Sequence, residues 1–384
     1  MGGPGAPAVG RLPLVDAVRA IAALLIFAYH AAFVLGGLGP DGAGPWLAHL
    51  NVGVPLFFAI SGFLLYRPFV AARAAGRERP SLRAYARRRV LRILPAYWVA
   101  LTVVAVALDR EEVFGGWRGA LTFYGFLQAY DASTITGGIG QAWTLSVEVA
   151  FYAVLPLAVL AAARRRWGVI AGIVVVSVAW KVVVGVTVDP AGSAYFPLLI
   201  ALPAVADLFA VGMALAVVSV TPPEGSVAFG ALARAPGLAW LAAAAAFATL
   251  GTDWPSAGPV TQLLRDRALE VVVVLGLLLP AVLATTGGGH VRRLLASRPL
   301  AGVGVVSYGV YLWHLDVLRE LESGGLPGAA VVVLGLAGSL ALGAASWYGI
   351  ERPAIAWRRR SPPRTTPLPA GAVGDRGDGR PAAG

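Results

Sequence analysis

The segment from Arg11 to Phe33 reads RLPLVDAVRAIAALLIFAYHAAF. This mostly apolar run is long enough to cross a bilayer of roughly 30 Å as one helix, yet it contains Asp16, Arg19 and His30. An ionisable group near the bilayer centre costs about 2.5–3.5 kcal/mol on insertion scales, which makes such groups candidates for function. Arg19 and His30 are separated by eleven positions, so in a helix they lie roughly 16 Å apart along the axis and close to one face. We therefore expect a helix bundle organised around this face.

The composition of the chain indicates an all-α, polytopic membrane protein. Of the 384 residues, 58% are hydrophobic and only 13% are charged, and the mean hydropathy is +0.73. The chain has no cysteine, which excludes disulfides, thiolate nucleophiles and cysteine-ligated metals. The net charge of +11 is better explained by basic cytoplasmic loops than by nucleic-acid binding. We therefore predict neither a nucleic-acid partner nor a metal site.

Hydrophobic periodicity predicts ten membrane spans with both termini in the cytoplasm. The predicted spans are 12–35, 51–70, 88–108, 143–163, 167–188, 196–219, 229–250, 268–286, 300–320 and 327–349. With the N-terminus inside, the inner segments hold 24 of the 31 basic residues, as the positive-inside rule requires. Residues 1–360 are expected to form one transmembrane domain in a bacterial plasma membrane. The Pro-, Gly- and Arg-rich residues 361–384 are expected to be a disordered cytoplasmic tail.

Three titratable residues fall at one depth in the outer half of the predicted membrane region. Counting from the inner surface at about 1.5 Å per residue puts His30 roughly 27 Å up, and His314 and Glu148 each roughly 21 Å up. Each of them alone is equally well explained as a polar group that joins neighbouring helices. Together, the three residues favour a functional site over helix packing.

A basic cluster precedes the third predicted span. Arg83, Arg87, Arg88, Arg89 and Arg92 lie at its inner end. They fit the positive-inside rule and lipid headgroup contact, and they also fit a phosphate-binding mouth, because guanidinium groups pair bidentately with phosphate. The two interpretations are compatible.

Other polar residues are weaker candidates for a functional role. Ser61, in the helix-interrupting stretch NVGVPLFFAISGFLL, is a candidate nucleophile, although a Ser-Gly pair is more often a kink or a packing contact. We predict that Ser61 and Trp143 contact substrate. Lys181 and Asp207, near mid-membrane in the fifth and sixth spans, are expected to form an ion pair with a structural role.

Six stretches resemble the acyltransferase-three family of integral membrane enzymes. They are LVDAVRAIAALLIFAYH, GVPLFFAISGFLL, RRRVLRILPAYW, WTLSVEVAFY, SYGVYLWH and the closing ERP at Glu351 to Pro353. The resemblance implies transfer of an acyl group, expected to be acetyl, from coenzyme A to a hydroxyl of a sugar, glycan or macrolide. It implies that Arg19 and His30 are essential, and it places Glu148 and His314 in conserved motifs.

The residues and the resemblance together predict one enzymatic mechanism, and two other functions are alternatives to it. The phosphates of cytoplasmic acyl-coenzyme A would bind Arg88, Arg89 and Arg92, and His30 would act as general base on the acceptor hydroxyl. Glu148 would orient the imidazole or position the acceptor, and His314 would stabilise developing charge. A covalent acyl-histidine stays open. The alternatives are a transporter or flippase of a lipid-linked or anionic substrate, and a structural or signalling membrane protein.

Overall fold

The computed structural model describes residues 13–222, 235–252, 258–283 and 289–357. Within these ranges the chain folds into helices, with no strand. The long helices are α1 (Pro13–Val34), α3 (Gly53–Ala74), α4 (Leu82–Ala107), α7 (Trp143–Thr187), α9 (Leu202–Val220), α12 (Pro259–Val282), α14 (Arg298–Ser323) and α15 (Gly328–Ser346). Shorter helices are α2 (Gly44–Ala48), α5 (Glu111–Phe114), α6 (Trp117–Tyr124), α8 (Tyr195–Ile200), α11 (Pro236–Leu250), α13 (Gly289–Leu295) and α16 (Arg352–Trp357). The predicted tail, 361–384, lies outside the described residues.

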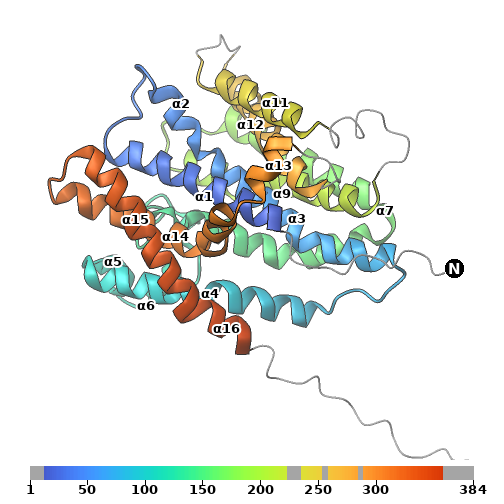
Figure 1. Ribbon diagram of the computed structural model, residues 1–384, viewed down its shortest axis with the longest axis horizontal. Helices are drawn as coiled ribbons and strands as arrows, with labels where there is room; N and C mark the ends of the chain where they lie inside the picture. Colours follow the sequence, from blue (N-terminus) through green and yellow to red (C-terminus); the bar gives the residue numbers. More distant parts are fainter. Residues whose placement is uncertain (1–12, 223–234, 253–257, 284–288, 358–384) are drawn as a thin grey trace, which may run out of the picture.

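The helices form a bundle in which α1 is central. It packs against both α3 and α14, and α3 in turn packs against α9. Figure 1 shows the long helices running across the view, with α5 and α6 at the left. We call the end at which α1 begins the inner end of the bundle, and the end at which α1 finishes the outer end. The cytoplasmic location of both chain termini remains a prediction.

Eight segments in the described part of the chain are long and apolar enough to cross a membrane. They are Leu14–Val34, Gly44–Ala74, Leu82–Ala107, Gly140–Ala162, Arg165–Thr187, Tyr195–Val220, Arg298–Ser323 and Gly328–Trp357. A bilayer offers no partner for free backbone groups, so apolar runs of this length fold as helices. The protein is therefore a multi-pass membrane protein, as the composition predicted.

The eight segments correspond to eight of the ten predicted spans, and the other two differ for physical reasons. The predicted span 229–250 corresponds to α11, whose 15 residues are short for a crossing. The predicted span 268–286 corresponds to α12, which has 24 residues but carries Arg265, Asp266, Arg267 and Glu270 in its first half. The predicted break between the fourth and fifth spans is confirmed, because Arg165 has non-helical backbone angles inside α7.

Glycines allow the central helices to approach closely. A side chain at Gly62 of α3 would collide with the backbone carbonyl of Phe209 on α9, and one at Gly212 of α9 would collide with the carbonyl of Ala59 on α3. Small residues at such crossings are typical of membrane helices, whose association depends on close packing. The same crossing places Ser61 of α3 beside the interior of the bundle.

The outer connection between α4 and α7 is folded. It contains α5, α6 and two short 3-10 turns. Tyr97 of α4 donates a hydrogen bond to the carbonyl of Phe123 at 2.8 Å, and the amide of Gln128 donates to the Tyr97 hydroxyl at 3.2 Å. The connection is thus fixed to α4 and leads into the start of α7, where Gln141, Trp143 and Thr144 enter the site.

Candidate functional site

His30 and His314 meet at the outer end of the bundle. Nε2 of His314, on α14, lies 2.9 Å from Nδ1 of His30, on α1. His314 is 1% exposed, and its ring packs at a tilt against Tyr311 and Phe27. The two residues that the sequence placed at similar depth on different spans are therefore direct neighbours.

Hydrogen bonding determines which nitrogen of each histidine carries the proton. Nδ1 of His314 faces the carbonyls of Tyr311 at 2.9 Å and Val310 at 3.2 Å, so it must donate. In the neutral ring Nε2 of His314 then accepts, and its donor is Nδ1–H of His30, which also lies 3.1 Å from the carbonyl of Ile26. This assignment follows from the partners, and it leaves Nε2 of His30 with a lone pair.

His30 lines a cavity at the outer end of the bundle, here called the outer cavity. Its lining includes His30, Asn51, Trp143, Phe196, Arg267 and Glu270. Trp143 and Phe196 stand edge to face, with ring centroids 6.3 Å apart. The outer cavity thus combines one basic nitrogen, flat aromatic walls and a pair of opposite charges.

A second cavity lies toward the inner end and is here called the inner cavity. Its lining includes Arg19, Ser61, Arg89, Arg92, Glu148 and Tyr152. Both oxygens of Glu148 accept hydrogen bonds at 2.7 Å, one from the Ser61 hydroxyl and one from the Tyr152 hydroxyl. Arg19 lies within electrostatic reach of Glu148. Three arginines therefore face the inner cavity against one glutamate.

Arg92 is held in place by the end of the chain's last long helix. Its guanidinium forms an ion pair with Glu351 at 2.6 Å and lies over the rings of Trp347 and Tyr308, with centroid distances of 5.1 and 5.7 Å. Trp347–Glu351 form a π-helical turn, a local widening that is frequent at functional sites. The ERP stretch noted in the sequence thus contributes Glu351 to the position of Arg92.

Arg89 is less constrained than Arg92. Its guanidinium lies 5.9 Å from the Tyr152 ring centroid, and its buried Nε has no hydrogen-bond partner among the described residues. Arg89 thus lines the inner cavity with a guanidinium whose Nε is not satisfied by the described residues.

The two cavities meet at Thr144 and Tyr311. Both residues line both cavities, as do Val54 and Phe58. The hydroxyls of Thr144 and Tyr311 lie 2.5 Å apart, and the Tyr311 hydroxyl donates to the carbonyl of Gln141 at 2.6 Å. These four residues form the boundary that the two cavities share.

The structure separates the predicted site residues into two groups. His30, His314 and Trp143 gather at the outer end, whereas Arg19, Ser61, Glu148, Arg89 and Arg92 gather around the inner cavity. Glu148 lines the inner cavity, where it accepts from Ser61 and Tyr152, whereas His30 lines the outer cavity. Glu148 lies four residues, or roughly 6 Å, further along α7 than Thr144. Arg88 is not among the residues that line either cavity.

The predicted ion pair between Lys181 and Asp207 is confirmed. Nζ of Lys181 lies 2.7 Å from Oδ2 of Asp207, and both side chains are buried. Tyr311, Arg267 and Glu270 were not among the site residues predicted from the sequence. Glu270 had a detectable signal, because an ionisable residue inside a predicted span is a candidate for function.

Comparison with known proteins identifies the chain's relatives. Residues 13–348 match the family model Acyl_transf_3, described as an acyltransferase domain. The peptidoglycan O-acetyltransferase of Listeria monocytogenes is 24% identical over 80% of this chain and 49% of its own length. Nodulation protein 10 of Rhizobium leguminosarum bv. viciae is 28% identical over 89% of this chain and 93% of its own.

A third relative, an acyltransferase of Streptomyces mycarofaciens, is 30% identical over 44% of this chain and 45% of its own length. The chain therefore spans about half the length of the Listeria enzyme and nearly all of the Rhizobium protein. No solved structure matches the chain.

Proposed function

The chain belongs to the acyltransferase-3 family, and on that premise we propose that it transfers an acetyl group from coenzyme A to a hydroxyl of a carbohydrate-containing acceptor, with His30 as general base. The observation that carries this proposal is the contact of 2.9 Å between the two histidines, which leaves Nε2 of His30 available to take a proton. The name of the Listeria relative, a peptidoglycan O-acetyltransferase, supports both the acetyl group and the carbohydrate acceptor.

The donor binds in the inner cavity. Coenzyme A is polyanionic, and Arg19, Arg89 and Arg92 line this cavity together. Guanidinium groups bind phosphate oxygens through two parallel hydrogen bonds. Since Glu351 already pairs with Arg92, Arg89, with its unpartnered Nε, makes the strongest new contact. The acyl thioester extends past Thr144 and Tyr311 toward His30.

The transfer step needs one base and returns its proton to the leaving group. Nε2 of His30 takes the proton of the acceptor hydroxyl while the oxygen attacks the thioester carbonyl carbon. The carbon–sulfur bond breaks, and the imidazolium gives the proton to the departing thiolate, which leaves as free coenzyme A. A positioned general base of this kind contributes about 10²–10⁴ in rate.

His314 supports His30 through its accepting nitrogen. When His30 becomes an imidazolium, its Nδ1–H strengthens as a donor toward Nε2 of His314, because hydrogen bonds from charged groups are stronger than neutral ones. His314 is held in this role by the two carbonyls that fix its own proton on Nδ1. It is a positioning residue, and it fixes the tautomer of His30.

The family match favours an enzyme over the transporter or flippase. The decisive experiment incubates the purified full chain with labelled acetyl-coenzyme A and candidate acceptors, and measures free coenzyme A and labelled product. We expect coenzyme A release that depends on an acceptor. We also expect His30→Gln, which keeps hydrogen bonding but cannot exchange a proton near pH 7, to reduce kcat about 10²-fold or more. Wild-type protein that releases no coenzyme A with any acceptor would refute the proposal.

A further inference from the structure

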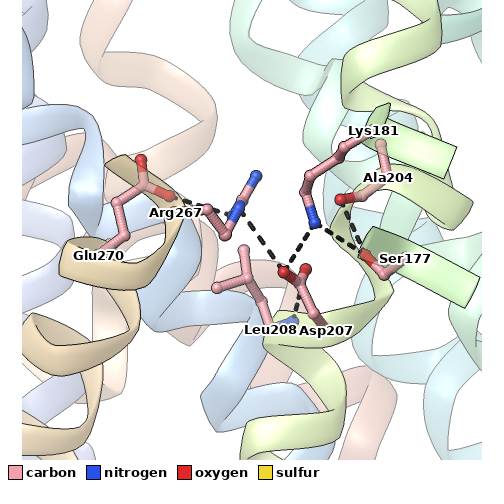
Figure 2. A network of polar contacts seen from close by, with 7 residues as sticks. All are labelled: Ser177, Lys181, Ala204, Asp207, Leu208, Arg267 and Glu270. Atoms are coloured by element: carbon pink, nitrogen blue, oxygen red, sulfur yellow. Dashed lines mark hydrogen bonds and ion pairs between the residues drawn. The ribbon is translucent and has the colours of Figure 1, made fainter. Parts of the chain in front are cut away.

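Four charged residues, here called the charge network, are linked across the outer half of the bundle. Lys181 of α7 pairs with Asp207 of α9 at 2.7 Å, and Nε of Arg267 on α12 lies 3.8 Å from the same Asp207 oxygen. Arg267 in turn contacts Glu270, one helical turn along α12, at 3.1 Å. Figure 2 shows the charge network running from Glu270 through Arg267 and Asp207 to Lys181.

The two ends of the charge network have different surroundings. At one end, Lys181 is 1% exposed, and it also donates to Ser177, whose hydroxyl donates to the carbonyl of Ala204. This end is closed by protein. At the other end, Arg267 and Glu270 line the outer cavity that contains His30.

At the cavity end, two buried polar atoms have no hydrogen bond among the described residues. Oε2 of Glu270 is buried and contacts Nη1 of Arg267 at 3.1 Å as an ion pair, but it has no hydrogen-bond partner among the described residues. Nε of Arg267 is also buried without a hydrogen bond among these residues, and it faces Asp207 at 3.8 Å. Leaving a buried polar atom without a partner is costly, and the cost is greater for charged groups. Buried ion pairs can often be replaced by apolar residues with no loss of stability. Stability alone therefore does not explain a charged pair at this wall.

We propose that Arg267 and Glu270 bind the acceptor and select an uncharged, hydroxyl-bearing ring, such as a neutral sugar. This inference rests on the proposed function and adds the residues that recognise the acceptor. A sugar hydroxyl both donates and accepts, so neighbouring hydroxyls can donate to Glu270 and accept from Arg267. The aromatic walls formed by Trp143 and Phe196 supply apolar faces against which the carbon side of such a ring packs.

Because its charges balance, the charge network favours binding of a neutral acceptor. Arg267 is compensated by Asp207 and Glu270 together, and Asp207 is compensated by Lys181. An anionic acceptor would bring a further negative charge toward Glu270 in a low-dielectric cavity, where repulsion is strong. Asp207 is a positioning residue, because it contacts the guanidinium of Arg267 and does not line the outer cavity. Lys181 in turn holds Asp207 through their ion pair.

The test compares acceptor recognition in three variants of the full chain. Glu270→Gln removes the charge and keeps the shape, and Arg267→Gln removes the cation. The matched control is Asp266→Asn, because Asp266 also lies on α12 but pairs with Arg265 at 2.7 Å and does not line the outer cavity. Labelled acetyl-coenzyme A is the donor, and a neutral hexopyranoside and the corresponding uronic acid are the acceptor probes.

Losing one hydrogen bond to a charged group should raise the acceptor KM about tenfold or more in Glu270→Gln and Arg267→Gln. The donor KM should be unchanged, and Asp266→Asn should behave as wild type. Glu270→Gln should also raise the ratio of kcat/KM for the uronic acid over the neutral sugar, because Arg267 loses its compensating charge. A structural role alone would not change this ratio.

The outcomes separate the two levels of the proposal. Wild-type protein that releases no coenzyme A with either probe, or with any other acceptor, overturns the proposed function. An active wild type whose acceptor KM and uronate ratio are unchanged in Glu270→Gln overturns the assignment of Arg267 and Glu270 and leaves the proposed function intact. If Arg267→Gln does not fold, the isosteric Glu270→Gln alone decides the question.

Discussion

Replacing His314 tests the role of the histidine pair. In His314→Phe the ring and its packing beside Tyr311 and Phe27 are kept, but the nitrogen that accepts from Nδ1 of His30 is lost. In His314→Gln the amide oxygen takes over as acceptor, while the amide nitrogen is available to the carbonyl of Val310. The two variants therefore differ in whether Nδ1–H of His30 keeps a hydrogen-bond acceptor.

The size of the effect follows from the contact of 2.9 Å between the two rings. In the transition state His30 carries the proton of the acceptor, so the lost hydrogen bond is one to a charged group, with a net value of about 1.5–3 kcal/mol. At 1.36 kcal/mol per factor of ten, kcat should fall about 10- to 150-fold in His314→Phe. His314→Gln should recover most of this loss, and neither variant should change the donor KM.

The assay is acceptor-dependent release of coenzyme A by purified protein, with thermal stability measured in parallel. Since His314 acts through His30, the double variant His30→Gln/His314→Phe should be no slower than His30→Gln alone, which is the non-additivity expected of coupled residues. The acid limb of the pH–rate profile should persist in His314→Phe and disappear in His30→Gln. A kcat near that of wild type in His314→Phe, or losses that multiply in the double variant, would refute the reasoning.

Three further predictions concern the donor site, the junction between the cavities and the topology. Arg89→Gln should raise the KM for acyl-coenzyme A about tenfold, more than Arg88→Gln does, and added salt should act in the same direction; an effect on the acceptor KM alone would contradict this. Thr144→Phe should fill the junction and lower kcat with little change in coenzyme A binding, and an unchanged kcat would contradict a passage there. Because the chain has no cysteine, Ser133→Cys should react with an impermeant thiol reagent from outside and Ala74→Cys should not. The opposite labelling pattern would reverse the predicted orientation.

The helix bundle was predictable because its signal is local. An apolar run of about twenty residues has to form a helix in a bilayer, and the cluster of arginines around Arg165 marks the break inside α7. The first half of α12 was not predictable in this way. A hydropathy window counts Arg267 and Glu270 as polar, and their pairing with Asp207 depends on helices far apart in the sequence.

The site was predictable where depth alone decided the contact. His30 and His314 lie at similar depths on different helices, and they meet. Glu148 was placed in the same layer, but it faces the inner cavity instead, because packing sets the tilt and rotation of each helix and counting residues from a span end does not. Helical periodicity does not separate Arg88 from Arg89, because they lie four and three positions from Arg92 and both spacings share a face. Only the packing of α4 shows that Arg88 lies outside both cavities.

The two cavities differ in charge in a way that matches the two substrates we propose. The inner cavity has three arginines against Glu148, and an excess of cations suits a polyphosphate donor. The outer cavity has Arg267 against Glu270 beside His30, and this balance suits an uncharged acceptor. A net negative charge beside the imidazole would favour the imidazolium, which has no lone pair, and a net positive charge would make the imidazole a weaker base. Balancing the charges at the acceptor wall therefore protects the base while still providing strong hydrogen-bonding groups for the substrate.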